Sequence, residues 1–152
     1  MPEYRLTTEI INRSRSNNWD AAKLEWQLQD VFESDDPDTC LCGHFPINEI
    51  CILRNRLSGT QVIVGNCCVK KFIGLPSDRL FQAVKRIRKD LENSLNGDAI
   101  EHAHEKGWIT DWERNFYLDI VRKRILSPRQ TAVKVRINEK VLRNMYRRRV
   151  NG

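Results

Sequence analysis

All five cysteines of the chain lie between residues 40 and 68. Cys40 and Cys42 are separated by one residue and are followed by Gly43, which tolerates the backbone angles of a tight turn. Cysteine thiolates are soft ligands, and zinc binds four such ligands tetrahedrally in closed structural sites. An odd number of cysteines also fits a disulfide framework poorly. The cluster therefore predicts one structural Zn²⁺ ion.

The choice of ligands depends on how the remaining cysteines are placed. Neighbouring residues at a helix start project about 100° apart, so we expect only one of Cys67 and Cys68 to bind the metal. Cys68 is favoured because it comes three residues after Gly65, one step into the expected helix. The fourth ligand is either Cys51 or His44, and softness favours the thiolate. The predicted ligands are Cys40, Cys42, Cys51 and Cys68, with His44 and Cys67 as alternates.

The residues between the two cysteine pairs predict a β-hairpin. Two apolar runs, residues 47–53 and 62–64, flank a polar turn over residues 55–59. Gly65 follows the second run, and a helix is expected to open at the adjacent cysteines. A knuckle, a hairpin and a helix start would thus carry thiolates to one metal ion.

Three motifs in this segment, CLCG at 40–43, NRLSG at 55–59 and VGNCC at 64–68, resemble the zinc-binding segment of small uncharacterised bacterial, phage and plasmid proteins. The likeness covers roughly residues 18–75, and its topology is similar to a treble-clef zinc finger. It implies a zinc site and a mobile-element or defence context, without an established activity. WERNF at 112–116 and LSPRQ at 126–130 resemble a two-helix segment of phage and mobile-element DNA-processing proteins.

Apolar spacing predicts about five helices around the zinc segment. Residues 1–16 show no clean periodicity, and we expect them to be partly mobile. Asn17-Asn18 is expected to cap a helix that runs past residue 31 and stops before the polar stretch 34–38. A second helix is expected over 78–95, ended by Asn96-Gly97, and a short one over 98–106. Thr110 and Ser127 begin capping boxes of two further helices, the first of which is expected to bury Trp112.

The net charge of +6 is unevenly distributed. Residues 110–152 contain 12 Lys/Arg and 4 Asp/Glu, a net charge of +8, so the rest of the chain carries −2. This asymmetry indicates an anionic partner. The last helix carries a basic stripe, and two lysines lie beside the zinc segment. The predicted nucleic-acid contacts are Arg129, Arg136, Lys140, Arg143, Arg147, Lys70 and Lys71.

The sequence therefore predicts a mostly helical α+β protein in which about five helices frame a treble-clef-like knuckle and hairpin. Its modules are residues 1–76, with the zinc segment, and 77–152, with the basic helical hairpin, packed as one compact unit. We expect a cytoplasmic protein, because no apolar run could span a membrane and no secretory signal is present. No nucleotide-binding loop, nucleophile elbow or HExxH motif occurs, so we do not expect an enzyme or a small-molecule substrate.

Two functions remain open from the sequence. The first is a small structural-zinc protein that binds nucleic acid, DNA rather than RNA, through the basic face of its last helix. The second is a protein-binding adaptor or inhibitor from a phage or mobile element, which would act on a host or defence protein.

Overall fold

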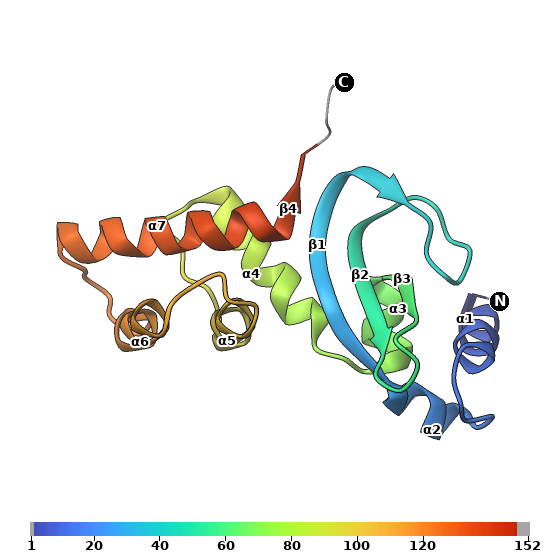
Figure 1. Ribbon diagram of the computed structural model, residues 1–152. Helices are drawn as coiled ribbons and strands as arrows, with labels where there is room; N and C mark the ends of the chain where they lie inside the picture. Colours follow the sequence, from blue (N-terminus) through green and yellow to red (C-terminus); the bar gives the residue numbers. More distant parts are fainter. Residues whose placement is uncertain (1, 149–152) are drawn as a thin grey trace. The chain divides into compact units, whose positions relative to one another are not determined.

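The computed structural model describes residues 2–148 and has an α+β fold, as the sequence predicts (Figure 1). The chain divides into two compact units. The first contains the described residues up to Asp78 together with Arg147 and Arg148, and the second contains Arg79–Tyr146. Among the described helices, none combines the length and apolar character needed to cross a membrane.

The first unit is built on a four-stranded sheet with the order β3-β2-β1-β4. Adjacent strands pair antiparallel from β1 to β2 and from β2 to β3. The predicted hairpin is thus confirmed as β2 and β3, within a larger sheet. Its elements are α1 (Pro2–Asn12), α2 (Trp19–Ala22), the 3₁₀ helix η1 (Lys23–Glu25), β1 (Trp26–Asp38), β2 (Ile47–Asn55), β3 (Gln61–Gly65), α3 (Asn66–Cys68) and the π-helical turn η2 (Val69–Ile73). The short strand β4 (Tyr146–Arg147) contains the last residue of the second unit and Arg147 of the first.

The N-terminal part of this unit corrects two predictions. Residues that lack clean periodicity form α1, which buries Leu6 and Ile10 completely. Asn18 does cap a helix, because its side chain accepts from the backbone N–H groups of Asp20 and Ala21. That helix ends at Ala22, however, and residues 26–38 form β1.

A β-bulge explains why β1 looks helical in the sequence. Leu28 pairs with Leu53, and Val31 pairs with Cys51, so the register shifts between these pairs. The extra residue places Leu28 and Val31 on the same face of the sheet although they are three positions apart. Three-residue spacing then resembles a helical stripe. Leu24, which belongs to the same apparent stripe, is 68% exposed.

Glu25 fixes the start of β1 to two neighbouring loops. This buried carboxylate accepts hydrogen bonds from the backbone N–H of Arg15 at 2.9 Å and of Ser16 at 3.0 Å, and from Asn55 Nδ2 at 3.0 Å. The bond from Arg15, followed by that from Asn55, lowers the pKa of the Glu25 carboxyl. The same Asn55 accepts from Leu57 N through Oδ1, so one asparagine connects the β2–β3 turn to Glu25.

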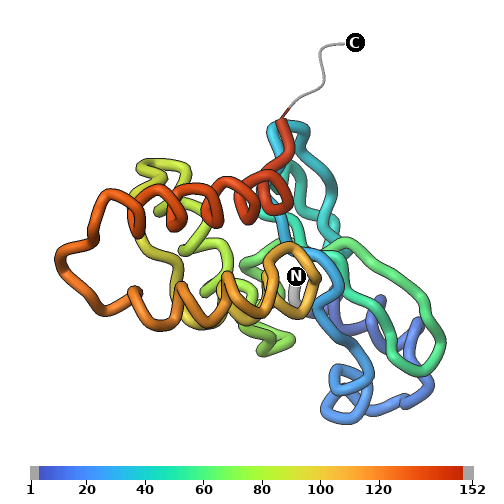
Figure 2. Tube along the Cα trace, turned by 60° about the vertical axis from the view of Figure 1, so that its left-hand side comes forward, coloured from blue at the N-terminus to red at the C-terminus, as the bar shows by residue number. Residues whose placement is uncertain are grey.

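The second unit is helical. Its elements are α4 (Ser77–Lys89), which begins at the end of the first unit, α5 (Gly97–Glu105), α6 (Asp111–Ile120) and α7 (Pro128–Met145). Both predicted capping boxes are confirmed, at Thr110 for α6 and at Ser127 for α7. Figure 2 shows α6 and α7 joined by the loop over residues 121–127.

Two predicted features of this unit are wrong. α4 ends at Lys89 and not at Leu95. Asn96 is an N-cap and not part of a C-cap, because its side chain accepts from Ala99 N at 2.9 Å and so starts α5. The apolar spacing that suggested a longer helix arises because Leu95, although outside α4, is also buried.

Tyr117 connects three segments in the core of the second unit. Its side chain is fully buried, its hydroxyl donates to Asn138 Oδ1 at 2.8 Å, and it accepts from Leu95 N at 2.9 Å. Asn138 Nδ2 in turn donates to the carbonyls of Leu91 and Asn93. α6, α7 and the loop after α4 thus share one buried polar network.

We predict that Tyr117→Phe lowers the free energy of unfolding by about 1–3 kcal/mol, because Leu95 N–H and Asn138 Oδ1 would remain buried without this partner. Denaturant unfolding measures the change. Tyr4→Phe is the matched control, since Tyr4 is 75% exposed and should leave stability unchanged. Equal stability of the Tyr117 variant and the native protein would contradict the network.

The same residue predicts a pH dependence. Burial raises the pKa of Tyr117 to about 12, above its ordinary value near 10. The fold therefore favours the neutral phenol, and this contribution is complete below about pH 10 and is lost as the pH rises through 12. Native protein should lose stability over this range more steeply than Tyr117→Phe, as measured by thermal unfolding at matched pH.

Candidate metal centre

The first two cysteines are positioned by a tight knuckle between β1 and β2. Cys40 N donates to His44 O at 2.9 Å, and Gly43 N donates to Cys40 O at 2.8 Å. Gly43 has a φ of +96°, a conformation that other residues rarely adopt, so glycine is required for this turn. Leu41 N donates to Ile63 O at 2.9 Å and attaches the knuckle to β3.

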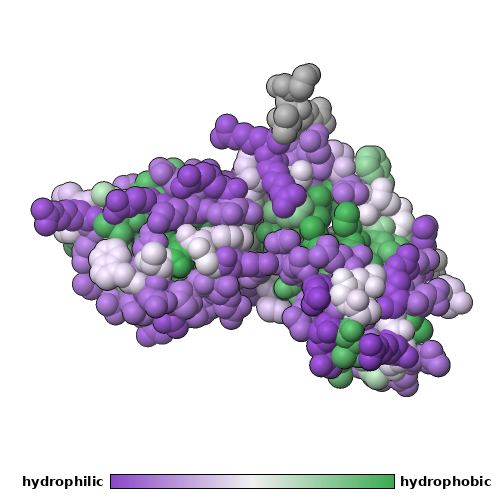
Figure 3. All heavy atoms as spheres, viewed as in Figure 1, coloured by the Kyte–Doolittle hydropathy of each residue, from purple (hydrophilic) through white to green (hydrophobic). Residues whose placement is uncertain are grey.

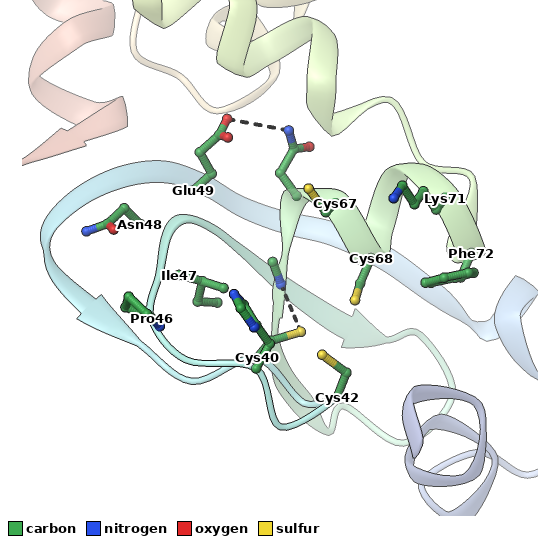
Figure 4. Close-up of a pocket in the computed structure, with 13 residues that line it drawn as sticks. Cys40, Cys42, Pro46, Ile47, Asn48, Glu49, Cys67, Cys68, Lys71 and Phe72 are labelled. Carbon is green, nitrogen blue, oxygen red and sulfur yellow. Dashed lines mark hydrogen bonds between the residues drawn. The ribbon is translucent and has the colours of Figure 1, made fainter. Parts of the chain in front are cut away.

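The third cysteine comes from the helix start that follows β3. Gly65 ends the strand, and its N–H donates to Cys40 Sγ at 3.3 Å. The side chain of Asn66 holds this junction in place, because its Oδ1 accepts from Ser77 Oγ at 2.7 Å and its Nδ2 donates to Asp78 Oδ1 at 3.1 Å. Cys68 then points toward the knuckle, whereas the Cys67 side chain points away (Figure 4).

Three sulfur atoms converge at this junction. Those of Cys40, Cys42 and Cys68 all lie within 4.8 Å of one another, and the three residues are 3–9% exposed. Zn–S bonds of about 2.3 Å in a tetrahedral site imply S···S distances of about 3.8 Å. The three sulfur atoms are therefore close to the spacing that zinc requires, and this donor set could hold a metal ion.

The three thiols share protons in a pattern that fits a metal-binding cluster. The hydrogen bond from Cys68, with those from Gly65 N and Cys42, lowers the pKa of the Cys40 thiol to about 5, although burial opposes the shift. The bond to Cys40, followed by burial, raises the pKa of Cys68. A divalent cation would replace the shared protons and stabilise all three thiolates.

Cys51 does not join the three clustered sulfurs, contrary to the predicted ligand set. Antiparallel pairing places it opposite Val31 and Val64 in the middle of the sheet, where it is fully buried. Burial raises the pKa of Cys51 to about 12, despite a hydrogen bond with the side chain of Ser77. The hairpin segment thus supplies a core thiol here.

A pocket of about 630 Å³ adjoins the three sulfur atoms. Besides the cluster, it is lined by the alternate ligands His44 and Cys67, both exposed. Apolar side chains of Pro46, Ile47 and Phe72 form other parts of its wall. The ring nitrogens of His44 lie outside the group of ligand atoms within 4.8 Å of one another, but this alternate ligand shares both the knuckle and the pocket with the cluster.

Some of the predicted nucleic-acid contacts already interact with other side chains of the protein. Lys140 Nζ lies 2.8 Å from Glu113 Oε2, and Lys70 Nζ lies 3.4 Å from Asp78 Oδ2. The Arg147 guanidinium lies 3.6 Å from the centre of the Phe32 ring. Lys71 lines the pocket beside the cysteines. These four side chains are already engaged or lie at the metal centre.

The remaining predicted residues, all on α7, are exposed. Three further exposed cations, which the sequence analysis did not single out, occupy the loop before α7. None of these six side chains has an ion pair or hydrogen bond within the described chain. The sequence signal that could have identified these three is that they are consecutive basic residues, 122–124, shortly before the start of α7. The six residues, here called the open cations, are Arg122, Lys123, Arg124, Arg129, Arg136 and Arg143.

Comparison with protein-family models, with curated proteins and with solved structures finds no match. The function is therefore inferred from the residues of the site.

We predict that Cys68→Ser strongly reduces bound metal per chain, because it removes one of three converging sulfurs. Cys67→Ser is the matched control: this neighbour is exposed and outside the cluster, so metal content should be retained. Elemental analysis after purification under reducing conditions measures both. Equal metal loss in the two variants, or loss only in the control, would contradict the assignment.

Proposed function

We propose that this chain is a small protein with one structural zinc ion that binds nucleic acid through the open cations of its second unit. The zinc part rests on the donor set. Three thiolates suit zinc in the reducing interior of a cell, and a closed fourth position is typical of structural sites. His44 is the proposed fourth ligand, since it lines the same pocket and closes the knuckle through its carbonyl.

A structural role follows from where the three cysteines come from. Two lie on the knuckle and one at the last residue of the short helix α3, with the β2–β3 hairpin between them. This arrangement is similar to a treble-clef finger, as proposed from the sequence. Zinc would join both ends of the hairpin, so metal binding would contribute to folding.

Purified protein should contain about one zinc ion per chain, and a chelator should lower its melting temperature. His44→Ala should weaken zinc retention by more than about tenfold, because loss even of a group supporting a ligand can cost that much. Cys51→Ala is the control and should retain zinc, whatever its effect on stability. Competition with a chromophoric chelator measures retention, and loss of zinc only in the Cys51 variant would reverse the choice.

The nucleic-acid part rests on one observation, the open cations. Residues 121–148 contain ten Lys/Arg and one Asp/Glu, Glu139. Other cations of the described structure are compensated by carboxylates, as Arg114 is by Glu101. Uncompensated cations are favourable sites for phosphate, because they release condensed counterions and lose no internal ion pair.

The spacing on α7 suits a linear anion. Arg129, Arg136 and Arg143 follow one another at intervals of seven residues, so they lie on one side of the helix, about 10 Å apart. Figure 3 shows hydrophilic side chains covering the visible face of α7. Contacts of this kind position phosphates and carry little sequence information, so we propose binding with low sequence selectivity, to DNA in preference to RNA.

Binding to short DNA should weaken steeply with salt. Arg136→Gln with Arg143→Gln should lower affinity and reduce the slope of log K against log salt by about 1.4–1.8, the contribution of two phosphate contacts. Arg54→Gln with Lys89→Gln is the charge-matched control, since it removes two exposed cations outside α7 that have no ion pair in the described structure. Fluorescence anisotropy across a salt series measures all three proteins.

Absence of binding at low salt would end the nucleic-acid proposal. Affinity purification with and without nuclease would then test the second function, the adaptor or inhibitor. Partners that survive nuclease treatment would favour that alternative.

A further inference from the structure

Trp112 is exposed, contrary to the prediction that it belongs to the buried face of α6. Its residue surface is 62% accessible, whereas Tyr117 and Ile120 on the same helix are buried. The Trp112 and Phe116 rings are stacked, with centroids 5.3 Å apart and planes inclined by 15°. Phe116 is only partly exposed, so it supports one face of an indole that otherwise faces solvent.

An ion pair joins the helix that carries this aromatic pair to the helix that carries three of the open cations. Glu113, the residue after Trp112, accepts an ion-pair contact from Lys140 at 2.8 Å. Arg136 and Arg143 lie four and three residues from Lys140, which places them one helical turn to either side. Trp112 and the two arginines are therefore grouped around a single contact between α6 and α7.

The Glu113–Lys140 pair neutralises one of the acids near Trp112, and the exposed acids that remain beside it are Asp111 and Glu139. Burial raises the pKa of the Glu113 carboxyl, but hydrogen bonds from Lys140 and from the Thr110 backbone outweigh it, and the net pKa is lowered. The carboxylate is 7% exposed and is neutralised by Lys140. Its negative charge is therefore not presented to a bound anion.

We propose that this surface binds single-stranded nucleic acid, with an unpaired base stacked on Trp112 and the adjoining phosphates on Arg136 and Arg143. The inference rests on the proposed nucleic-acid function and specifies its substrate class. An exposed indole held by a second ring is a stacking platform that every base can use. Bases inside a duplex are already stacked and paired, so a duplex would reach only the arginines.

The charges favour this occupant over a protein. A hydrophobic docking partner would leave Arg136 and Arg143 facing apolar surface, whereas a single strand offers both a ring and phosphates at short intervals. The combination of an aromatic pair and unpaired cations is the pattern expected of proteins that bind single strands with little sequence preference.

The test compares binding of the full chain to a single-stranded oligothymidylate and to a hairpin duplex of equal charge. Trp112→Ala should weaken single-strand binding by about 5- to 140-fold and leave duplex binding and the salt slope unchanged. Trp112→Phe should retain most of the affinity, while the quenching of tryptophan fluorescence by the oligonucleotide should be lost. Ile125→Ala, at a residue that is 89% exposed beside the loop cations, is the control and should bind as the native chain does.

Equal single-strand affinity of Trp112→Ala and native protein would overturn the inference while leaving salt-dependent binding through the arginines intact. A preference for duplex would overturn it in the same way. Failure of the native chain to bind either nucleic acid at low salt would instead remove the proposed function, and the inference with it. Circular dichroism of each variant identifies any loss of fold, and Trp112→Phe alone still decides the quenching test.

Discussion

The strongest constraint on the first unit is that three sulfur atoms share one small buried space. Three thiolates would repel one another there, so protons or a cation must offset the charge. Without a cation the thiols of Cys68 and Cys42 hydrogen-bond to Cys40, which takes most of the negative charge. A divalent ion would offset the charge of the thiolates in place of the protons. The net charge of the site would then depend on whether the fourth ligand is neutral or anionic. The surrounding chain has to hold the sulfur atoms close together whichever cation or proton is present.

Backbone hydrogen bonds, more than side-chain contacts, hold the three sulfur atoms close together. Leu41 N–H binds β3 and Gly65 N–H binds the Cys40 sulfur, so the knuckle and the helix start are attached to the same strand. A Cβ on Gly65 would lie 3.2 Å from the Ile47 side chain, so a larger residue would require that side chain to move by a few tenths of an ångström beside the clustered sulfur atoms. The sheet thus sets the spacing of the ligands, and Asn66 anchors the helix start to α4 through Ser77.

Local signals in the sequence predict local structure well. The knuckle, the hairpin and both capping boxes depend on residues close in sequence, and each is present in the structure. Cys51 and β1 could not be placed in the same way because their surroundings come from strand pairing. A strand residue points to one face or the other according to register, and the bulge between Leu28 and Asp30 changes that register in β1. Sequence spacing alone therefore mistook a bulged strand for a helix and a core thiol for a ligand.

The net charge of a segment likewise does not show which of its cations can reach a partner, because some of them form contacts within the fold. The last 43 residues carry a net charge of +8, which favours an anionic partner. Lys140, however, forms an ion pair with Glu113, and the guanidinium of Arg147 lies over the ring of Phe32. A phosphate can reach the cations left after internal pairing, and among the described residues six of these lie within the 22 positions from Arg122 to Arg143. The aromatic and apolar side chains of α6 are divided in the same way. Tyr117 and Ile120 are buried in the core, whereas the indole of Trp112 remains exposed. The residues that a partner can reach are those the fold has not used.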